Sequence, residues 1–427
     1  MLAPLILLIF YYSLFLFLFY WLSKTGRISL SFQQASLIFT LKFLFGCLYG
    51  LLFLKLYNGD DTWKSHYESL TEYSKLKSNP LTFFTEIFHN GYAKSQALTF
   101  FDSNKSYWKN LPENLLFKLL AIFNLFSNSN YYVNVLFFNL ITLCGHYFLY
   151  KIFLRFFPLK QAIVFTLVFF FPSLIFWESG IRKDGISFTA LTGCLYYLLQ
   201  YTYERKKVIS LAKALFFFIL LFLFKNFIAL SLIPPFIALS IAVKYQKKTG
   251  ITFATTLIAS LVLFFSTSLG PAQLNLPQKM AERQNAFLQL EGGSYMPIPA
   301  LQGRIQSYLA VFPIAINHSL LRPYITEARN PLNIFAALEN ILVIGIILLS
   351  FYRFRSLKAI ISQPGIALLL SIACINYLIV GYTVPFAGAV IRYRAMFEIL
   401  LLVPLLIAID KNEWITKPLN KVYNYLV

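Results

Sequence analysis

The chain has 427 residues, of which 58% are hydrophobic and 13% are charged, and its formal net charge is +20 at pH 7. A water-soluble globular protein needs a far larger polar surface to cover that many apolar residues, so the composition excludes this class. The sequence predicts an all-α polytopic membrane protein. Most basic residues stand in short connections between apolar stretches, so the positive charge does not indicate a nucleic-acid-binding domain.

Eleven apolar stretches approach the length of about 17–25 residues with which a helix crosses a bilayer. They are continuous and lack the alternation of barrel strands, so we expect about eleven transmembrane helices. The predicted spans are 2–22, 35–57, 131–150, 161–177, 186–203, 211–224, 227–243, 251–268, 334–351, 365–383 and 396–409. Only Lys225 and Asn226 separate the sixth span from the seventh, so residues 211–243 form either a tilted pair of helices or a broken, re-entrant pair.

Basic residues set the orientation of a polytopic membrane protein, because loops rich in Lys and Arg stay on the cytoplasmic side. They gather here in alternate short connections, from Lys24 and Arg27 to the C-terminal tail. This pattern predicts an external N-terminus and a cytoplasmic C-terminus. The chain is then one integral membrane domain, 1–427, with two long external loops at 58–130 and 269–333. Apolar residues at helical spacing within these loops predict interfacial helices.

The first long loop opens on Asn58-Gly59, a turn-forming pair, and continues with the adjacent carboxylates Asp60 and Asp61. The two acids are either a solvated helix end or catalytic groups. In the second interpretation, the low dielectric at the membrane boundary raises the pKa of a carboxylate and makes it a better general base. The acid would also lie level with the head group of a lipid-linked substrate.

A second polar segment joins two apolar stretches by a short external connection and holds charges of both signs: Glu178, Arg182, Lys183 and Asp184. Such charges at a membrane boundary rarely stay unpaired. The segment is therefore either a structural ion-pair cluster or an anion site, in which Arg182, Lys183 and Asp184 help to bind a phosphate.

Arginine residues mark the other external segments. Guanidinium groups grip phosphate bidentately, and the positive-inside rule does not account for Arg on the external side. They predict a site for a phosphate or pyrophosphate leaving group, with Glu327 beside them. The candidates are Arg304, Arg322, Arg329, Arg392 and Arg394. Glu339, inside the ninth predicted span, is either a functional acid or the partner of an Arg.

Metal and cofactor chemistry find little support in the sequence. The four Cys residues lie inside predicted spans and the four His residues lack metal-ligand spacing, so we predict no metal site. The chain also lacks the Gly-rich motifs that bind nucleotides. We therefore expect no cofactor, and a need for a divalent metal stays open.

The acidic pair at the start of a long first external loop resembles the acidic motif of membrane glycosyltransferases of the GT-C superfamily. Segment 172–184 and the turn Arg392-Tyr393-Arg394 resemble bacterial inner-membrane proteins of polysaccharide biosynthesis. The resemblance implies a hexosyltransferase-like enzyme of the bacterial inner (plasma) membrane. One acid of the pair would activate the acceptor, and the donor would be a polyprenyl-phosphate or polyprenyl-pyrophosphate sugar. The implied partners are this lipid-linked sugar, a saccharide acceptor and membrane lipid, without nucleic acid.

Two departures from the GT-C pattern bear on this resemblance. Residues 2–22 add a helix ahead of the acidic motif, and no large soluble domain follows the spans, so substrate selection would rest on the loops. A second resemblance is to Wzy-type repeat-unit polymerases and O-antigen ligases, which use Arg-rich external loops. A flippase or transporter is a third interpretation, kept open by Lys42, Lys55 and Glu339 inside spans, although the two long loops argue against it.

Overall fold

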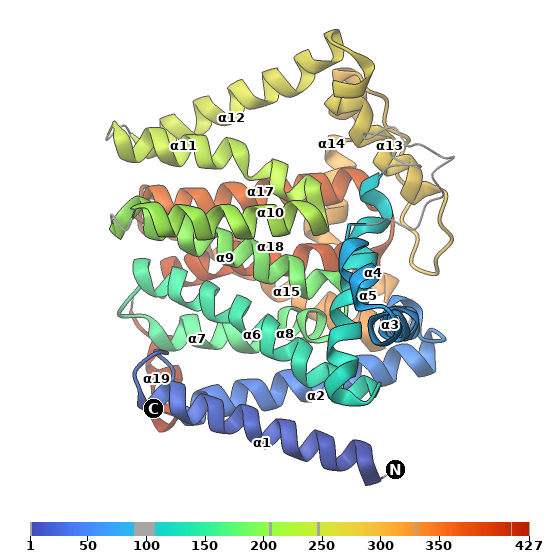
Figure 1. Cartoon of the computed structure of the whole chain (residues 1–427). Helices are drawn as coiled ribbons and strands as arrows, with labels where there is room; N and C mark the ends of the chain where they lie inside the picture. Colours follow the sequence, from blue (N-terminus) through green and yellow to red (C-terminus); the bar gives the residue numbers. More distant parts are fainter. Residues whose placement is uncertain are drawn as a thin grey trace.

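The computed structural model describes residues 2–88, 107–204, 207–245, 248–328, 331–410 and 412–426. In these ranges the regular elements are helices, and the long ones form a bundle with the two chain termini at opposite ends (Figure 1). The bundle helices are α1 (Leu2–Lys24), α2 (Phe32–Leu56), α6 (Tyr131–Phe156), α7 (Gln161–Phe170), α8 (Pro172–Ser179), α9 (Lys183–Glu204), α10 (Lys207–Ser231), α11 (Ile233–Lys244), α12 (Thr249–Ser266), α15 (Pro331–Tyr352), α17 (Pro364–Thr383) and α18 (Ala387–Ile409).

Seven helices in the described part of the chain are long and apolar enough to cross a membrane: α1, α2, α6, α10, α12, α15 and α17. The pair of α7 and α8, bent by 45° at its junction, would be an eighth. The structure therefore confirms an all-α membrane protein but does not confirm the count of eleven spans. Among the remaining helices, α11 has only 12 residues, α9 begins with Lys183 and Asp184, and α18 carries Arg392, Arg394 and Glu398.

The predicted break in the apolar run of α10 is present, at Lys225. This residue has a non-helical backbone (φ −147°, ψ 78°) and divides the helix in two. Leu232 keeps a right-handed helical conformation (φ −77°, ψ −22°), so residues 226–244 continue from the second half of α10 through α11 almost without interruption. Pro234 and Pro235 fall in the first turn of α11, where proline is well tolerated.

The two long loops also form helices. The first loop contains α3 (Asp60–Ser78), α4 (Pro80–Thr85) and α5 (Tyr107–Ser127). The second loop contains two helices, α13 (Leu276–Leu288) and α14 (Ile305–Ile316). It also contains four short helical turns: η1 (Thr267–Leu269), η2 (Ala272–Leu274), η3 (Asn317–Leu321) and η4 (Ile325–Glu327). α3, α5 and α13 gather at one end of the bundle, which we call the loop end (Figure 1). Two further short helices are α16 (Phe354–Ile361) and α19 (Thr416–Tyr425), and α19 lies at the opposite end.

The connection between α8 and α9, which the sequence predicts on the external side of the membrane, is buried inside the protein. Ile181 is 0% exposed and Arg182 3% exposed, and Ile181 belongs to an apolar cluster with residues of α5, against which Trp63 of α3 also packs. The helices of the first loop thus cover this connection. Gly46 allows α2 to approach from the other side, since a Cβ there would lie 2.6 Å from the carbonyl oxygen of Ser179. The charges of this connection therefore lie inside the protein.

Candidate active site

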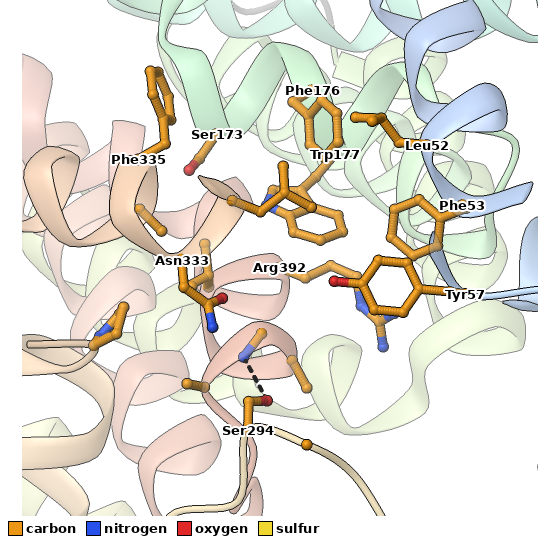
Figure 2. Close-up of a pocket in the computed structure, with 18 of the residues that line it drawn as sticks. Leu52, Phe53, Tyr57, Ser173, Phe176, Trp177, Ser294, Asn333, Phe335 and Arg392 are labelled. Atoms are coloured by element: carbon orange, nitrogen blue, oxygen red, sulfur yellow. Dashed lines mark hydrogen bonds between the residues drawn. The ribbon is translucent and has the colours of Figure 1, made fainter. Parts of the chain in front are cut away.

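A cavity of about 1290 Å³ lies among segments that are far apart in the sequence. Its walls come from α2, α7, α8, the N-terminal turns of α15 and α18, and two loop segments, 292–297 and 322–327. Figure 2 shows Trp177 and Arg392 near the middle of this cavity, with Tyr57 to one side of them. Most of these segments meet at the loop end of the bundle.

One part of the cavity is an apolar groove along α2. Leu41, Phe45, Leu48 and Leu52 line this groove, and they share one face of the helix because their spacings of four, three and four residues follow the helical repeat. Tyr57, sixteen residues beyond Leu41, also lines the cavity, which corresponds to about 24 Å at a rise of about 1.5 Å per residue. The hydrocarbon core of a bilayer is about 30 Å thick, so the groove is deep enough for a long lipid chain.

The other part of the cavity is charged. It is lined by Asp60, Arg322, Glu327 and Arg392, so two carboxylates and two guanidinium groups face the same space. All four residues were predicted as site residues from the sequence. The cavity therefore joins a charged end to a long apolar groove, and this form suits an amphipathic ligand with an ionic head and an apolar chain.

Asp60 reaches the cavity through a tight turn between α2 and α3. Asn58, Gly59 and Asp60 all have a left-handed backbone, with φ of 50°, 96° and 44°. A glycine suits the middle position, because a Cβ there would also lie 2.9 Å from the Cβ of Trp63. The predicted Asn-Gly turn is thus present, and its strained backbone lies directly beside the candidate base.

Arg182 binds both acids of the predicted catalytic pair. Its Nη1 donates to Asp60 Oδ2 and to the hydroxyl of Tyr49, each over 2.9 Å, and its Nη2 pairs with Asp61. The guanidinium is buried behind the cavity wall, whereas the side chain of Asp61 is 56% exposed and does not line the cavity. Of the two predicted carboxylates, Asp60 is the one that faces the cavity.

The ion pair with Arg182 reverses the predicted pKa shift of Asp60. Burial by itself raises the pKa of this carboxyl, as expected at a membrane boundary. The guanidinium of Arg182 and the backbone amide of Asp61 more than offset burial, and the net pKa is below the ordinary value of 3.8. The predicted rise was therefore wrong, because the sequence did not place a guanidinium from 122 residues away against this acid.

Asp184 is the centre of a buried charge cluster behind the cavity. Its carboxylate pairs with Lys225 and lies 3.7 Å from the Nε of Arg182 and 3.7 Å from the Nε of Arg392. Together with the acidic pair on α3, the cluster has three carboxylates and three cations and is formally neutral. The structure thus supports the ion-pair interpretation of this segment. It also shows that Asp184 lies against Arg392, which lines the cavity.

Neither Lys225 nor Tyr49 was predicted as a site residue. Lys225 lies at the break in α10, where its Nζ reaches Asp184 and comes within 4.6 Å of the ring centre of Tyr393. A cation that interrupts an apolar run is a signal that could have identified it. Tyr49 lies in the middle of an apolar stretch, and nothing in the sequence distinguishes it from a core residue.

The N-terminus of α18 forms part of the charged end. Gly388 and Ala389 line the cavity together with Arg392. Ser294 holds this helix end, because its carbonyl oxygen accepts from the backbone N–H of Ala387 over 2.9 Å and its Oγ from that of Gly388 over 3.4 Å (Figure 2). Ser294 already accepts from the first two N–H groups of α18, so it is mainly the helix dipole that favours an anion at this end. The helix end and the guanidinium therefore make this wall suited to a phosphate.

Arg322 and Arg394 occupy different places. Arg322 lines the cavity, and its Nη2 pairs with Glu327 Oε1 over 2.9 Å. Arg394 is 1% exposed and does not line the cavity. Its Nη1 donates to the carbonyl oxygens of Ser319 and Arg322, each over 3.0 Å. Arg394 therefore fixes the backbone of the segment that carries Arg322, and the structure does not bring it to the predicted phosphate site.

Two other predicted residues of the described part of the chain do not line the cavity. Arg304 is exposed at the N-terminus of α14 and does not line the cavity. Lys183 pairs with Glu113 of α5 over 3.0 Å and so links α9 to the first loop. Arg329 lies outside the described residues. Among the described residues, Arg322 and Arg392 are therefore the predicted arginines that line the cavity.

In the described part of the chain, no three His, Cys, Asp or Glu side chains come together as metal ligands. Comparison of the chain with protein-family models, with curated proteins and with solved structures found no match. The function must therefore be argued from the chemistry of the cavity.

Proposed function

We propose that the chain is a glycosyltransferase that moves a sugar from a polyprenyl-phosphate or polyprenyl-pyrophosphate donor to a saccharide acceptor. The product would be a cell-surface polysaccharide or glycoconjugate. The observation that carries the proposal is the amphipathic cavity, which joins the apolar groove along α2 to the charged end with Asp60, Arg322 and Arg392. A polyprenyl chain fits the groove, and its phosphate then lies among the guanidinium groups.

The reaction follows from these positions. A hydroxyl oxygen of the acceptor attacks the anomeric carbon of the donor sugar and loses its proton to Asp60. The bond between that carbon and the phosphate oxygen breaks, and polyprenyl phosphate, or polyprenyl pyrophosphate from the second type of donor, leaves with the electron pair. Arg392, Arg322 and the N-terminus of α18 stabilise the charge that grows on the leaving phosphate. Attack opposite the leaving group inverts the configuration of the anomeric carbon.

A second candidate is a Wzy-type repeat-unit polymerase or an O-antigen ligase. One observation favours it: Asp60 is bound to Arg182, and its lowered pKa makes it a weaker base. In this version the transfer would depend on the arginine residues that stabilise the leaving phosphate, with little help from a carboxylate. Both candidates use the same donor site, and they differ in the importance of Asp60.

We place the enzyme in a bacterial inner membrane, with its loop end and N-terminus outside and its C-terminus in the cytoplasm. In this arrangement α9, residues 226–244 and α18 would cross the membrane beside the candidate spans, which completes eleven passes. Lys225 supports this arrangement, because its contact with Asp184 puts the break in α10 at the loop end. The active site would then open to the outer face.

The test is binding of polyprenyl phosphate, the shared part of all these donors, to the purified full chain in detergent micelles. We expect Arg392→Lys and Arg322→Lys each to weaken binding by about tenfold, because lysine keeps the charge but loses the bidentate geometry. Arg304→Lys is the matched control, since Arg304 belongs to the same loop region as Arg322 but does not line the cavity. Absence of binding to the unmodified chain, or equal loss in all three variants, would contradict the proposal.

A further inference from the structure

Two charged side chains inside apolar helices do not belong to the cavity. Lys42 of α2 is 0% exposed and Glu339 of α15 is 5% exposed, and neither lines the cavity. Among the described residues neither has an oppositely charged side chain within 4.0 Å. Charges buried in membrane-spanning helices often mark a transport path or a proton relay. Here they have a different set of partners.

Both side chains reach the ends of α8. Glu339 Oε2 accepts from the backbone N–H of Ser173, in the first turn of α8, over 2.9 Å. Lys42 Nζ lies 3.5 Å from the carbonyl oxygen of Glu178 and 3.3 Å from the Oγ of Ser179, at the last turn. A carboxylate from one neighbouring helix and an ammonium group from another therefore hold the two ends of the same short helix.

The two side chains bind backbone groups that the ends of α8 leave without a partner inside the helix. This helix has eight residues and follows the 45° bend at its junction with α7. No side chain of its own caps its N-terminus, and Pro172 has no N–H, so the N–H of Ser173 is the first free donor. Free backbone groups inside a bilayer have no water to bind. The N-terminus of a helix carries a partial positive charge and its C-terminus a partial negative charge. An anion at the first end and a cation at the second are therefore both stabilised by the helix dipole.

We propose that Lys42 and Glu339 are positioning residues that clamp α8 from both ends and so fix the wall of the active site. α8 presents Ser173, Phe176 and Trp177 to the cavity and leads directly into the connection that carries Arg182. The effect on catalysis rests on the proposed function, whereas the clamp itself is a property of the fold.

The packing of α2 supports the clamp at the C-terminal end. Lys42, Gly46 and Tyr49 share one face of α2, at spacings of four and three residues. Gly46 permits the close approach to Ser179, and Tyr49 accepts a hydrogen bond from Arg182. One face of α2 therefore holds both the end of α8 and the arginine that follows it.

Hydrogen exchange of the full chain in detergent micelles tests the clamp without any substrate. Glu339→Leu removes the acceptor for the N–H of Ser173. Loss of a helix cap costs about 1–2 kcal/mol of stability, so hydrogen exchange at the start of α8 should become about five- to thirtyfold faster. Glu339→Gln keeps an acceptor oxygen and should change exchange much less. Lys42→Met should speed exchange through the end of α8 and residues 180–182, and Lys42→Gln should restore part of the protection. Lys55→Met, on the exposed side of the same helix, is the control and should have no effect.

Transfer activity supplies the second readout. The two Gln variants should keep most of the wild-type kcat, whereas Glu339→Leu and Lys42→Met should lower kcat with a small effect on the KM for the donor. Gln variants that are as inactive as the apolar ones, with α8 still protected, would show that the charges themselves are needed and would overturn the clamp. If exchange follows the expected pattern but no protein binds polyprenyl phosphate, the clamp stands and the proposed function fails.

Discussion

The guanidinium of Arg182 donates to the carboxylate of Asp60 over 2.9 Å, and this ion pair joins the start of α3 to the connection between α8 and α9. The same guanidinium lies 3.7 Å from Asp184, which in turn lies 3.7 Å from Arg392. The candidate base and the candidate phosphate-binding residue are thus the two ends of one chain of charges. The effects of substituting Asp60 and Arg392 should therefore be coupled rather than additive.

The first prediction concerns the candidate base. Asp60→Asn should lower transfer by about 10²–10⁴-fold, the usual cost of losing a general base, while the amount of protein in the membrane stays normal. Asp61→Asn is the matched control and should have a smaller effect, because Asp61 is 56% exposed and does not line the cavity. Full activity of Asp60→Asn would favour the polymerase or ligase interpretation, in which transfer depends on the arginine residues that stabilise the leaving phosphate.

The second prediction is the pH dependence of turnover. The pKa of Asp60 lies below the ordinary value of 3.8, so this carboxyl stays ionised at pH 5, and the rate should not fall between pH 7 and pH 5 for this reason. Arg182→Gln removes the main group that lowers this pKa, and the acid limb of the pH–rate profile should then move to higher pH. An unchanged acid limb in Arg182→Gln would argue against Asp60 as the titrating base.

The same shift has a consequence for stability. A depressed pKa in the folded state means that the ion pair of Asp60 with Arg182 stabilises the fold above the ordinary aspartate pKa. This contribution should be lost as the pH falls through the lower, folded-state pKa. Thermal unfolding in micelles should therefore show a smaller decrease in Tm on acidification for Asp60→Asn than for the unmodified chain. Equal decreases would show that the pair adds nothing measurable.

The apolar groove gives a third prediction. Leu48→Trp fills part of the groove and should reduce transfer from a donor with a long polyprenyl chain more than from one with a short chain. Leu44→Trp is the control, because Leu44 is 53% exposed on the same helix and does not line the cavity. An assay with donors of two chain lengths measures the difference. If both Trp variants behave alike, the lipid chain does not lie along this face of α2.

Cysteine labelling tests the orientation. In a chain without its four native cysteines, Ala300→Cys in the second long loop should react with a membrane-impermeant reagent added to whole cells. Ser362→Cys, in the connection between α16 and α17, should react only after the membrane is opened. Both positions are exposed in the structure. Labelling of Ser362→Cys but not of Ala300→Cys in whole cells would put the cavity on the cytoplasmic side and contradict the proposed topology.

The left-handed turn before Asp60 gives a prediction on stability. Gly59→Ala should destabilise the fold by about 1–2 kcal/mol, because an L-residue is strained at a φ of 96° and its Cβ would crowd Trp63. Gly250→Ala in α12 is the control, since a Cβ there meets nothing within 4 Å and alanine favours a helix. Thermal unfolding of the two variants, measured side by side, should show a decrease in Tm for Gly59→Ala alone.

The local pattern of the sequence determined much of the fold. Long apolar runs must become helices in lipid, because backbone groups can bond only to one another there. The interruption at Lys225 predicted the break in α10, and Asn58-Gly59 predicted the turn that precedes Asp60. These features depend on neighbouring residues alone, so no knowledge of the tertiary structure was needed.

Only the tertiary structure decided which charged residues share a site. Arg392 and Arg394 are equivalent in the sequence, but two residues along a helix turn the side chain by about 200°, so one lines the cavity and the other binds backbone carbonyls. Arg182 meets Asp60 across 122 residues, because Gly46 allows α2 to pack closely and the first loop covers the connection between α8 and α9. Such contacts depend on how distant helices pack against each other, which no local pattern of apolar and charged residues specifies.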